Sequence, residues 1–121
     1  MPYEFYLVLH LLGVFMIVGS LSAMSVHVMG GGNRNYPARK LVGAVHGAGL
    51  LFVLVAGFGL LARLGLVQGM PTWVIVKLVI WLILGGIPAL IYRKAKFAKL
   101  FWLCTFLFAG AAAYLGVYKP F

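Results

Sequence analysis

Apolar side chains fill four long stretches of the chain, and polar residues interrupt them only at short breaks. The stretches cover about residues 5–29, 41–67, 71–93 and 100–118. A helix needs about 20 apolar residues to cross the roughly 30 Å of hydrocarbon in a bilayer, and each stretch is long enough. Because the breaks are short, we expect an all-α, four-helix up-down bundle that forms a single transmembrane domain over residues 1–121.

Composition indicates that lipid surrounds this bundle. Hydrophobic residues make up 64% of the 121 positions, and charged residues make up only 9%. A water-soluble domain of this length leaves about a third of its unfolded surface exposed, so this chain would present large apolar patches to water. We therefore expect the lipid bilayer to be its main partner.

The basic residues behind the net charge of +9 lie mostly in the breaks between the apolar stretches. The first break holds Arg34, Arg39 and Lys40. The third holds four basic residues between 93 and 99, whereas only Arg63 precedes the second. Basic loops favour the cytoplasmic side, which predicts a multi-pass protein of the cell inner membrane with both termini on the non-cytoplasmic side. No polar segment gathers the charge, so we do not expect nucleic acid as a partner.

Small residues recur where transmembrane helices could approach closely. Those within the first, second and fourth stretches include Gly13, Gly19, Ser20, Ser22, Gly47, Gly49, Gly57, Gly59 and residues 110–113. For most of them we expect tight packing of backbone against backbone. Gly85, Gly86 and Pro88 should bend the third helix, since proline lacks a backbone donor and clashes with the preceding turn.

Ionisable side chains inside a bilayer are costly and therefore mark candidate functional positions. At 1.5 Å per residue, His10 lies roughly 10 Å and Lys77 roughly 6 Å from the outer face. His27 lies about 2 Å and His46 about 8 Å from the inner face. His10 and His46 are then about 15 Å apart along the membrane normal, too far to bind one iron. A single cofactor would use either the outer pair or the inner pair.

These residues suit axial ligation of haem b between helices, because neutral imidazole is a common ligand of haem iron and bundle cores often hold such groups. Structural roles stand beside this one. A membrane histidine can donate to a backbone carbonyl, His27 can meet water at the interface, and Lys77 can extend toward the headgroups. The single carboxylate, Glu4, excludes paired acids inside the bilayer and a cage for a hard cation.

Three segments carry a family resemblance. The segment LHLLGVFMIVGSLSAMSVH, from Leu9 to His27, resembles the first helix of HemJ-type bacterial protoporphyrinogen oxidases and their CopD-like relatives. TWVIVKLVIWL, from Thr72 to Leu82, is similar to the Trp-x-x-x-Lys-Leu segment of that family, and the ending YLGVYKPF is similar to its last helix followed by Lys-Pro.

The resemblance implies a four-helix membrane fold that binds haem b and oxidises protoporphyrinogen IX, with electrons passed to a quinone. By position, His10 matches the histidine of the family's first helix and is the candidate iron ligand, and Lys77 matches the lysine of its third helix. The first helix here lacks the arginine and the tryptophan of the family enzymes, and the first connector is much shorter. These departures leave enzymatic activity open.

Three hypotheses follow. The leading one is a small haem b-binding membrane protein that acts in porphyrin oxidation or in electron transfer to quinone, with His10, Lys77, His46 and His27 as candidate cofactor-binding residues. The alternative is a non-catalytic accessory subunit or small transport component, assembled as a homo-oligomer or within a larger membrane complex. Copper handling ranks third, and its soft ligands would be Met16, Met24, Met29 and His27.

Overall fold

The computed structural model describes residues 2–33, 35–65 and 69–118. Its elements are four long helices and one short 3₁₀ helix. They are α1 (Tyr3–Met29), α2 (Arg39–Arg63), α3 (Thr72–Arg93), η1 (Ala95–Phe97) and α4 (Ala98–Tyr118). The all-α architecture and the existence of four long apolar helices are therefore as the sequence predicted.

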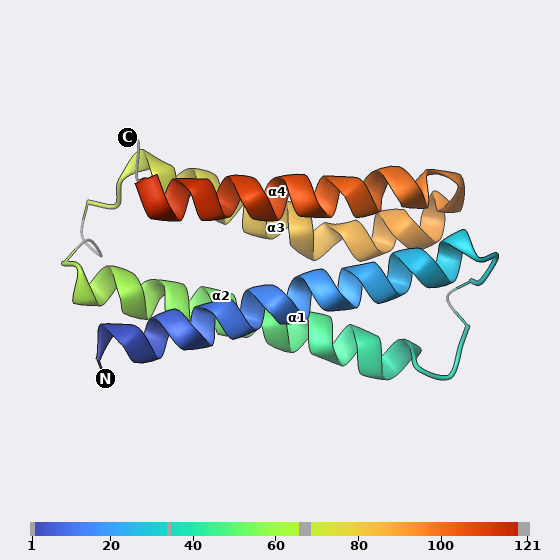
Figure 1. The fold of residues 1–121 in the computed structure, drawn as a ribbon, viewed down its shortest axis with the longest axis horizontal. Coiled ribbons are helices and arrows are strands. Elements are labelled where there is room, and N and C mark those ends of the chain that lie inside the picture. Colours follow the sequence, from blue (N-terminus) through green and yellow to red (C-terminus); the bar gives the residue numbers. More distant parts are fainter. Residues whose placement is uncertain (1, 34, 66–68, 119–121) are drawn as a thin grey trace.

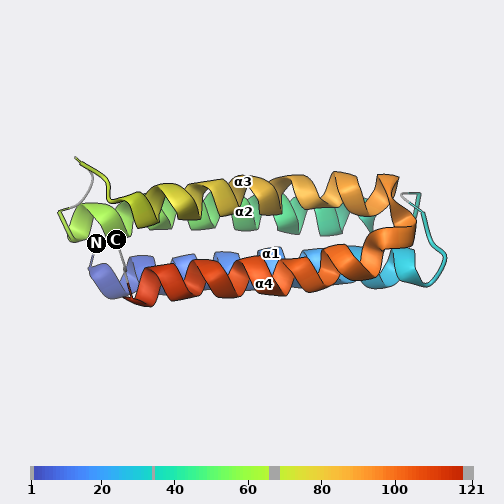
Figure 2. The same cartoon turned by 90° about the horizontal axis from the view of Figure 1, so that it is seen from above.

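The helices form an antiparallel up-down bundle. Figure 1 shows α3 and α4 as one pair beside α1 and α2, and Figure 2 shows that α2 and α3 form one layer over α1 and α4. Each helix therefore neighbours the helices that precede and follow it in the chain, and α4 also packs against α1. The start of α1 and the end of α4 lie at the same end of the bundle (Figure 1).

Glycines end the first two helices. Gly30 caps α1, and Gly31 follows with a φ of 93° that favours glycine. After α2, Gly65 has a φ of 73°, and its backbone N–H bonds to the carbonyl of Ala62. The helix ends at Arg63, whereas residue 67, where the sequence analysis placed the end of the second stretch, lies outside the described residues. The apolar run continues past a glycine whose left-handed backbone ends the helix.

Helices α1 and α2 pack backbone against backbone where Gly13 meets Gly49. A Cβ atom on Gly13 would lie 2.8 Å from the Gly49 carbonyl oxygen, and one on Gly49 would lie 2.9 Å from the Gly13 carbonyl oxygen. Neither position has room for a methyl group, which confirms the close packing expected there. Open space surrounds the Cβ positions of Gly19, Gly47 and Gly110, so these three are not closely packed within the bundle.

The outer surface of the bundle is apolar. Large hydrophobic side chains such as Val8, Phe15 and Leu107 are more than half exposed, while Leu21 and Ile91 are fully buried in the core. Each of the four helices is long and apolar enough to cross a membrane. Exposure of this kind is unfavourable in water and favourable in lipid, and it indicates a multi-pass membrane protein.

Candidate functional site

Two side-chain hydrogen bonds bridge α2 and α3, which approach each other less closely than the other neighbouring helices. The Trp81 Nε1 atom donates to the Leu50 carbonyl oxygen over 3.0 Å. In the opposite direction, the His46 Nε2 atom donates to the Leu84 carbonyl oxygen over 3.2 Å. We call this pair of bonds the α2–α3 bridge. It fixes the separation of two helices whose backbones do not pack tightly.

Proline explains why the Leu84 carbonyl accepts a bond from another helix. In a regular helix this oxygen would accept the backbone N–H of the residue four positions later, which is Pro88. Proline has no such N–H, so the carbonyl loses its helical partner. The buried His46 ring supplies the missing donor. Its contact with Leu84 therefore satisfies a backbone group that would be costly to leave unpaired in an apolar interior.

Two cavities lie along the bundle, one on each side of the α2–α3 bridge. The first has a volume of about 460 Å³ and is lined by all four helices, with His10 and Lys77 among its walls. The second has a volume of about 400 Å³ and is lined by His46 together with Arg39 and Arg93. We call them the His10 cavity and the Arg39 cavity. Trp81 and Leu84 border the first and His46 borders the second, which places the bridge between them.

His10 is held by a hydrogen bond across the α1–α2 interface. Its half-buried ring donates from Nδ1 to the Val53 carbonyl oxygen over 3.2 Å. A carbonyl only accepts, so Nδ1 carries the proton and Nε2 of the neutral ring keeps its lone pair. Nε2 has no hydrogen-bond partner among the described residues. Every fully buried side-chain nitrogen of the described residues does have a partner, so Nε2 is not fully buried. Nε2 is therefore accessible, and the His10 ring lines the cavity.

Glycine at position 57 leaves room for the His10 ring. A Cβ atom there would lie 3.6 Å from Cε1 of His10, in ordinary contact, whereas a larger side chain would press on the ring. The remaining wall is mostly apolar, and it includes the indole rings of Trp73 and Trp81. The cavity thus combines one oriented imidazole with flat, apolar walls, a combination typical of sites for small molecules and cofactors.

Lys77 enters the same cavity from α3. Its Nζ atom lies 2.9 Å from the place where a Cβ atom on Gly116 would stand, so the ammonium approaches α4 where that helix has no side chain. His10 and Lys77 both line this cavity. The structure therefore brings together the two residues that the depth estimate assigned to one level. A lysine inside an apolar bundle is rare, so Lys77 stays a candidate functional position.

The inner pair does not converge in this way. His46 lies in the α2–α3 bridge, while His27 stacks on Tyr36 with ring centroids 3.9 Å apart. The Nε2 atom of His27 donates to the carbonyl oxygen of Asn33 over 2.8 Å, and His27 lines neither cavity. His27 therefore ties the end of α1 to the following connection.

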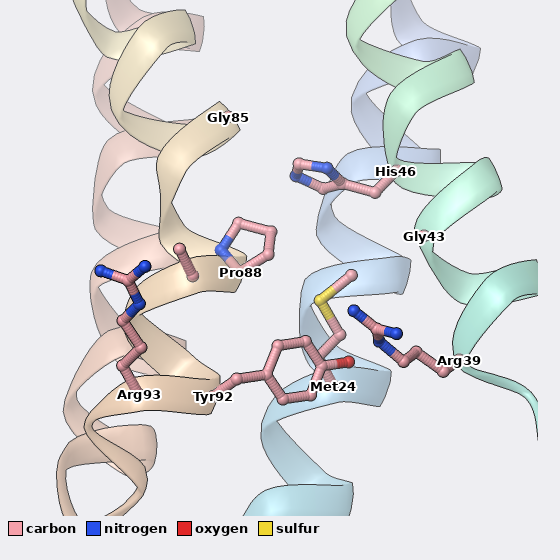
Figure 3. A pocket seen from close by; sticks show the side chains of 9 residues that line it. Met24, Arg39, Gly43, His46, Gly85, Pro88, Tyr92 and Arg93 are labelled. Carbon is pink, nitrogen blue, oxygen red and sulfur yellow. The ribbon is translucent and has the colours of Figure 1, made fainter. Parts of the chain in front are cut away.

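The Arg39 cavity opens at the end of the bundle opposite the termini. Figure 3 shows the Arg39 guanidinium directed between α2 and α3 toward Tyr92, with Arg93 on the α3 side. The His46 ring points across toward Pro88 at its deeper end (Figure 3). At the mouth, the Tyr92 hydroxyl lies 2.5 Å from the Tyr36 hydroxyl.

A metal site built from several protein ligands is not found among residues 2–33, 35–65 and 69–118, since no three His, Cys, Asp or Glu side chains there gather closely enough. The three methionines considered for copper lie in different surroundings. Met16 packs against Gly49, Met24 is buried beside the Arg39 cavity, and Met29 is exposed.

Sequence reasoning did not identify Trp81, Tyr92, Arg39 or Arg93 as site residues. The arginines entered it only as markers of orientation, although the sequence places both at helix ends of one side. Pro88 offered a usable signal for the bridge, because any proline within a helix frees the carbonyl four residues earlier. The partner of that carbonyl could not be deduced, since it depends on how α2 and α3 pack.

Comparison of the chain with family models, curated proteins and solved structures finds no match. The cavities, their side chains and the membrane character of the fold therefore carry the functional argument.

Proposed function

We propose that this chain is a haem b-binding integral protein of the cell inner membrane, which acts in porphyrin oxidation or in electron transfer to quinone. The observation that carries the proposal is His10, whose Nδ1–H is fixed by the Val53 carbonyl while its ring lines an apolar cavity. Metal-binding histidines almost always donate their other ring N–H to a carbonyl or carboxylate in this way.

The residues present fit a haem group in the His10 cavity. Its volume of about 460 Å³ lies within the range of pockets for small molecules and cofactors, and its walls are predominantly apolar. His10 would hold the iron through Nε2, and Lys77 from α3 would be a further ligand. When bound, haem b supplies one-electron transfer.

The chain's own groups prepare this site. The Val53 carbonyl selects one tautomer of His10 and fixes the plane of its ring. Gly57 and Gly116 keep the space beside His10 and Lys77 free of side chains. Trp73 and Trp81 offer flat walls, and most of the surrounding side chains are aliphatic. An apolar site favours a planar, mostly apolar macrocycle over a hydrated ion.

The distribution of charge supports the membrane orientation included in the proposal. Arg39 begins α2 and Arg93 ends α3 at one end of the bundle, and further lysines follow at residues 94, 96 and 99. Glu4 lies at the opposite end, near the start of α1. The positive-inside rule then directs the basic end to the cytoplasm and both termini to the other side.

Purified protein from haem-producing cells tests the proposal. We expect a Soret band in detergent, visible bands that change on reduction, and oxidation either of protoporphyrinogen IX with a quinone acceptor or of a reduced donor by quinone. The two turnover assays distinguish porphyrin oxidation from simple electron transfer. A monodisperse, helical preparation that carries no pigment and takes up no added haem would refute the proposal.

A second candidate is a packing subunit of a larger membrane assembly. Gly19, Gly47 and Gly110 favour it, because open space surrounds their Cβ positions and none of them borders either cavity. Small residues on an outer helix face allow another helix to approach closely. Native mass measurement separates the two functions, since a pigmented particle consisting of this chain alone contradicts an accessory role.

A further inference from the structure

We propose that the Arg39 cavity binds the headgroup of an anionic phospholipid from the membrane leaflet at the basic end of the bundle. This inference rests on the membrane-spanning placement of the helices and is independent of haem in the His10 cavity. The two sites lie on opposite sides of the α2–α3 bridge.

Charge provides the first argument. Arg39 comes from the first turn of α2 and Arg93 from the last turn of α3, so basic residues from two helices line one cavity. Glu4 is the only acidic side chain of the protein, and it lies at the other end of the bundle. No side-chain carboxylate is therefore available to neutralise the two arginines. Guanidinium groups bind phosphate oxygens through strong, directional hydrogen bonds.

The gradient of polarity along the cavity provides the second argument. Arg39 and Tyr92 lie at its mouth, whereas Met24, Pro88 and Ala89 give the walls an apolar surface. From Arg39 to His46 is about 10 Å along the helix axis. A free phosphate ion would use only the mouth of such a cavity. A phospholipid uses its full depth, because its phosphate is followed by glycerol and the start of an acyl chain.

The mouth is also held in place before any ligand arrives. The Tyr92 hydroxyl pairs with the Tyr36 hydroxyl at 2.5 Å, and the Tyr36 ring stacks on His27. These contacts join α3 to the α1–α2 connection. At the deeper end, His46 is fixed by the Leu84 carbonyl. Basic pockets between transmembrane helices on the cytoplasmic side are typical binding sites for anionic lipid headgroups.

Gly43 supplies the space for the lipid. Nothing lies within 4 Å of the position that its Cβ atom would take, although the residue lines the cavity. A leucine at this position would project into the cavity without changing any charge. The variant Gly43→Leu therefore tests occupancy of the cavity separately from its electrostatics.

Native mass spectrometry of the delipidated full-length protein tests the proposal. The protein is titrated with phosphatidylglycerol, with phosphatidylcholine of the same acyl chains, and with inorganic phosphate. We expect a saturable complex with one phosphatidylglycerol and much weaker complexes with the other two. The double variant Arg39→Gln/Arg93→Gln should bind phosphatidylglycerol about thirtyfold more weakly, or about fivefold for each lost charge.

The matched control is Lys96→Gln/Lys99→Gln, which removes the same charge from the same end but alters no residue that lines the cavity. It should retain wild-type affinity, and Gly43→Leu should lose it. Circular dichroism and size-exclusion profiles verify that every variant folds. Equal losses in both double variants, equal binding of the two lipids, or saturable binding of inorganic phosphate at the same affinity would each overturn the proposal. Haem content is a separate measurement, so failure of one proposal leaves the other testable.

Discussion

The Nε2 atom of His46 lies 3.2 Å from the carbonyl oxygen of Leu84, the carbonyl that Pro88 leaves without its helical partner. A polar side chain on α2 thus compensates for a proline on α3. Its location explains how the bundle tolerates a proline in an apolar interior, and it assigns His46 a structural role that does not require a cofactor.

We predict that His46→Ala destabilises the protein by about 1–3 kcal/mol, because it leaves the Leu84 carbonyl buried without a donor. Replacing Pro88 by Ala restores the backbone N–H that this carbonyl lacks. His46→Ala should therefore lower the free energy of unfolding by a clearly smaller amount when Pro88 is also replaced by Ala. Reversible unfolding in mixed detergent micelles measures all four proteins of this double-mutant cycle. An identical cost in both backgrounds would show that the bond to Leu84 contributes nothing.

Because α1 packs closely on α2, one added methyl group at their contact should destabilise the protein strongly. Gly13→Ala places a Cβ atom 2.8 Å from the Gly49 carbonyl oxygen, and this oxygen can move only if helix α2 moves. The substitution should therefore lower the free energy of unfolding by about 1–3 kcal/mol. Gly19→Ala, on the same helix with open space at its Cβ position, should leave the free energy of unfolding unchanged or raise it. The same unfolding assay compares them. Equal effects would contradict the close approach of the two helices.

A larger side chain that fills the His10 cavity should weaken the binding of haem. Gly57→Leu would press a side chain against the His10 ring, since even a Cβ atom there lies 3.6 Å from Cε1. We expect haem affinity to fall about tenfold or more while the helical content is kept. Gly110→Leu adds the same side chain where nothing lies within 4 Å and should bind haem normally. Pigment per chain, measured after purification, distinguishes these outcomes.

We predict that Lys77 contributes to haem binding. Lys77→Met keeps the length of the side chain and removes the ammonium group from the cavity. If Lys77 is the second axial ligand, its loss changes the spin state of the ferric iron, which visible absorption and electron paramagnetic resonance detect. An unchanged spectrum would remove Lys77 from the ligand set.

Much of the fold follows from sequence, because each apolar stretch in a membrane has to satisfy its backbone hydrogen bonds within a helix. The stops at Gly30 and Arg93 follow from the same pattern. The end of α2 does not, because hydropathy continues beyond Gly65 and only the local backbone conformation ends the helix. Hydropathy likewise cannot distinguish Gly13, which contacts α2, from Gly19, which faces outward.

The candidate site was partly predictable for a similar reason. Height along the helix axis follows from residue number, and the His10 and Lys77 that it paired both line one cavity. Rotation about that axis depends on packing, which residue number does not specify. Heights therefore suggested an inner pair of His27 and His46, whereas His27 stacks on Tyr36 and His46 bonds to Leu84. Whether haem binds at His10 stays a prediction.

Titration of haem into purified, pigment-free protein tests the central claim most directly. Wild type should bind one haem per chain and develop a sharp Soret band, His10→Ala should lose most of this affinity, and His46→Ala should retain it. All three proteins are compared in one detergent at equal helical content. Retention of full haem affinity by His10→Ala, or its equal loss in both variants, would contradict the assignment of His10 as the residue that holds the cofactor.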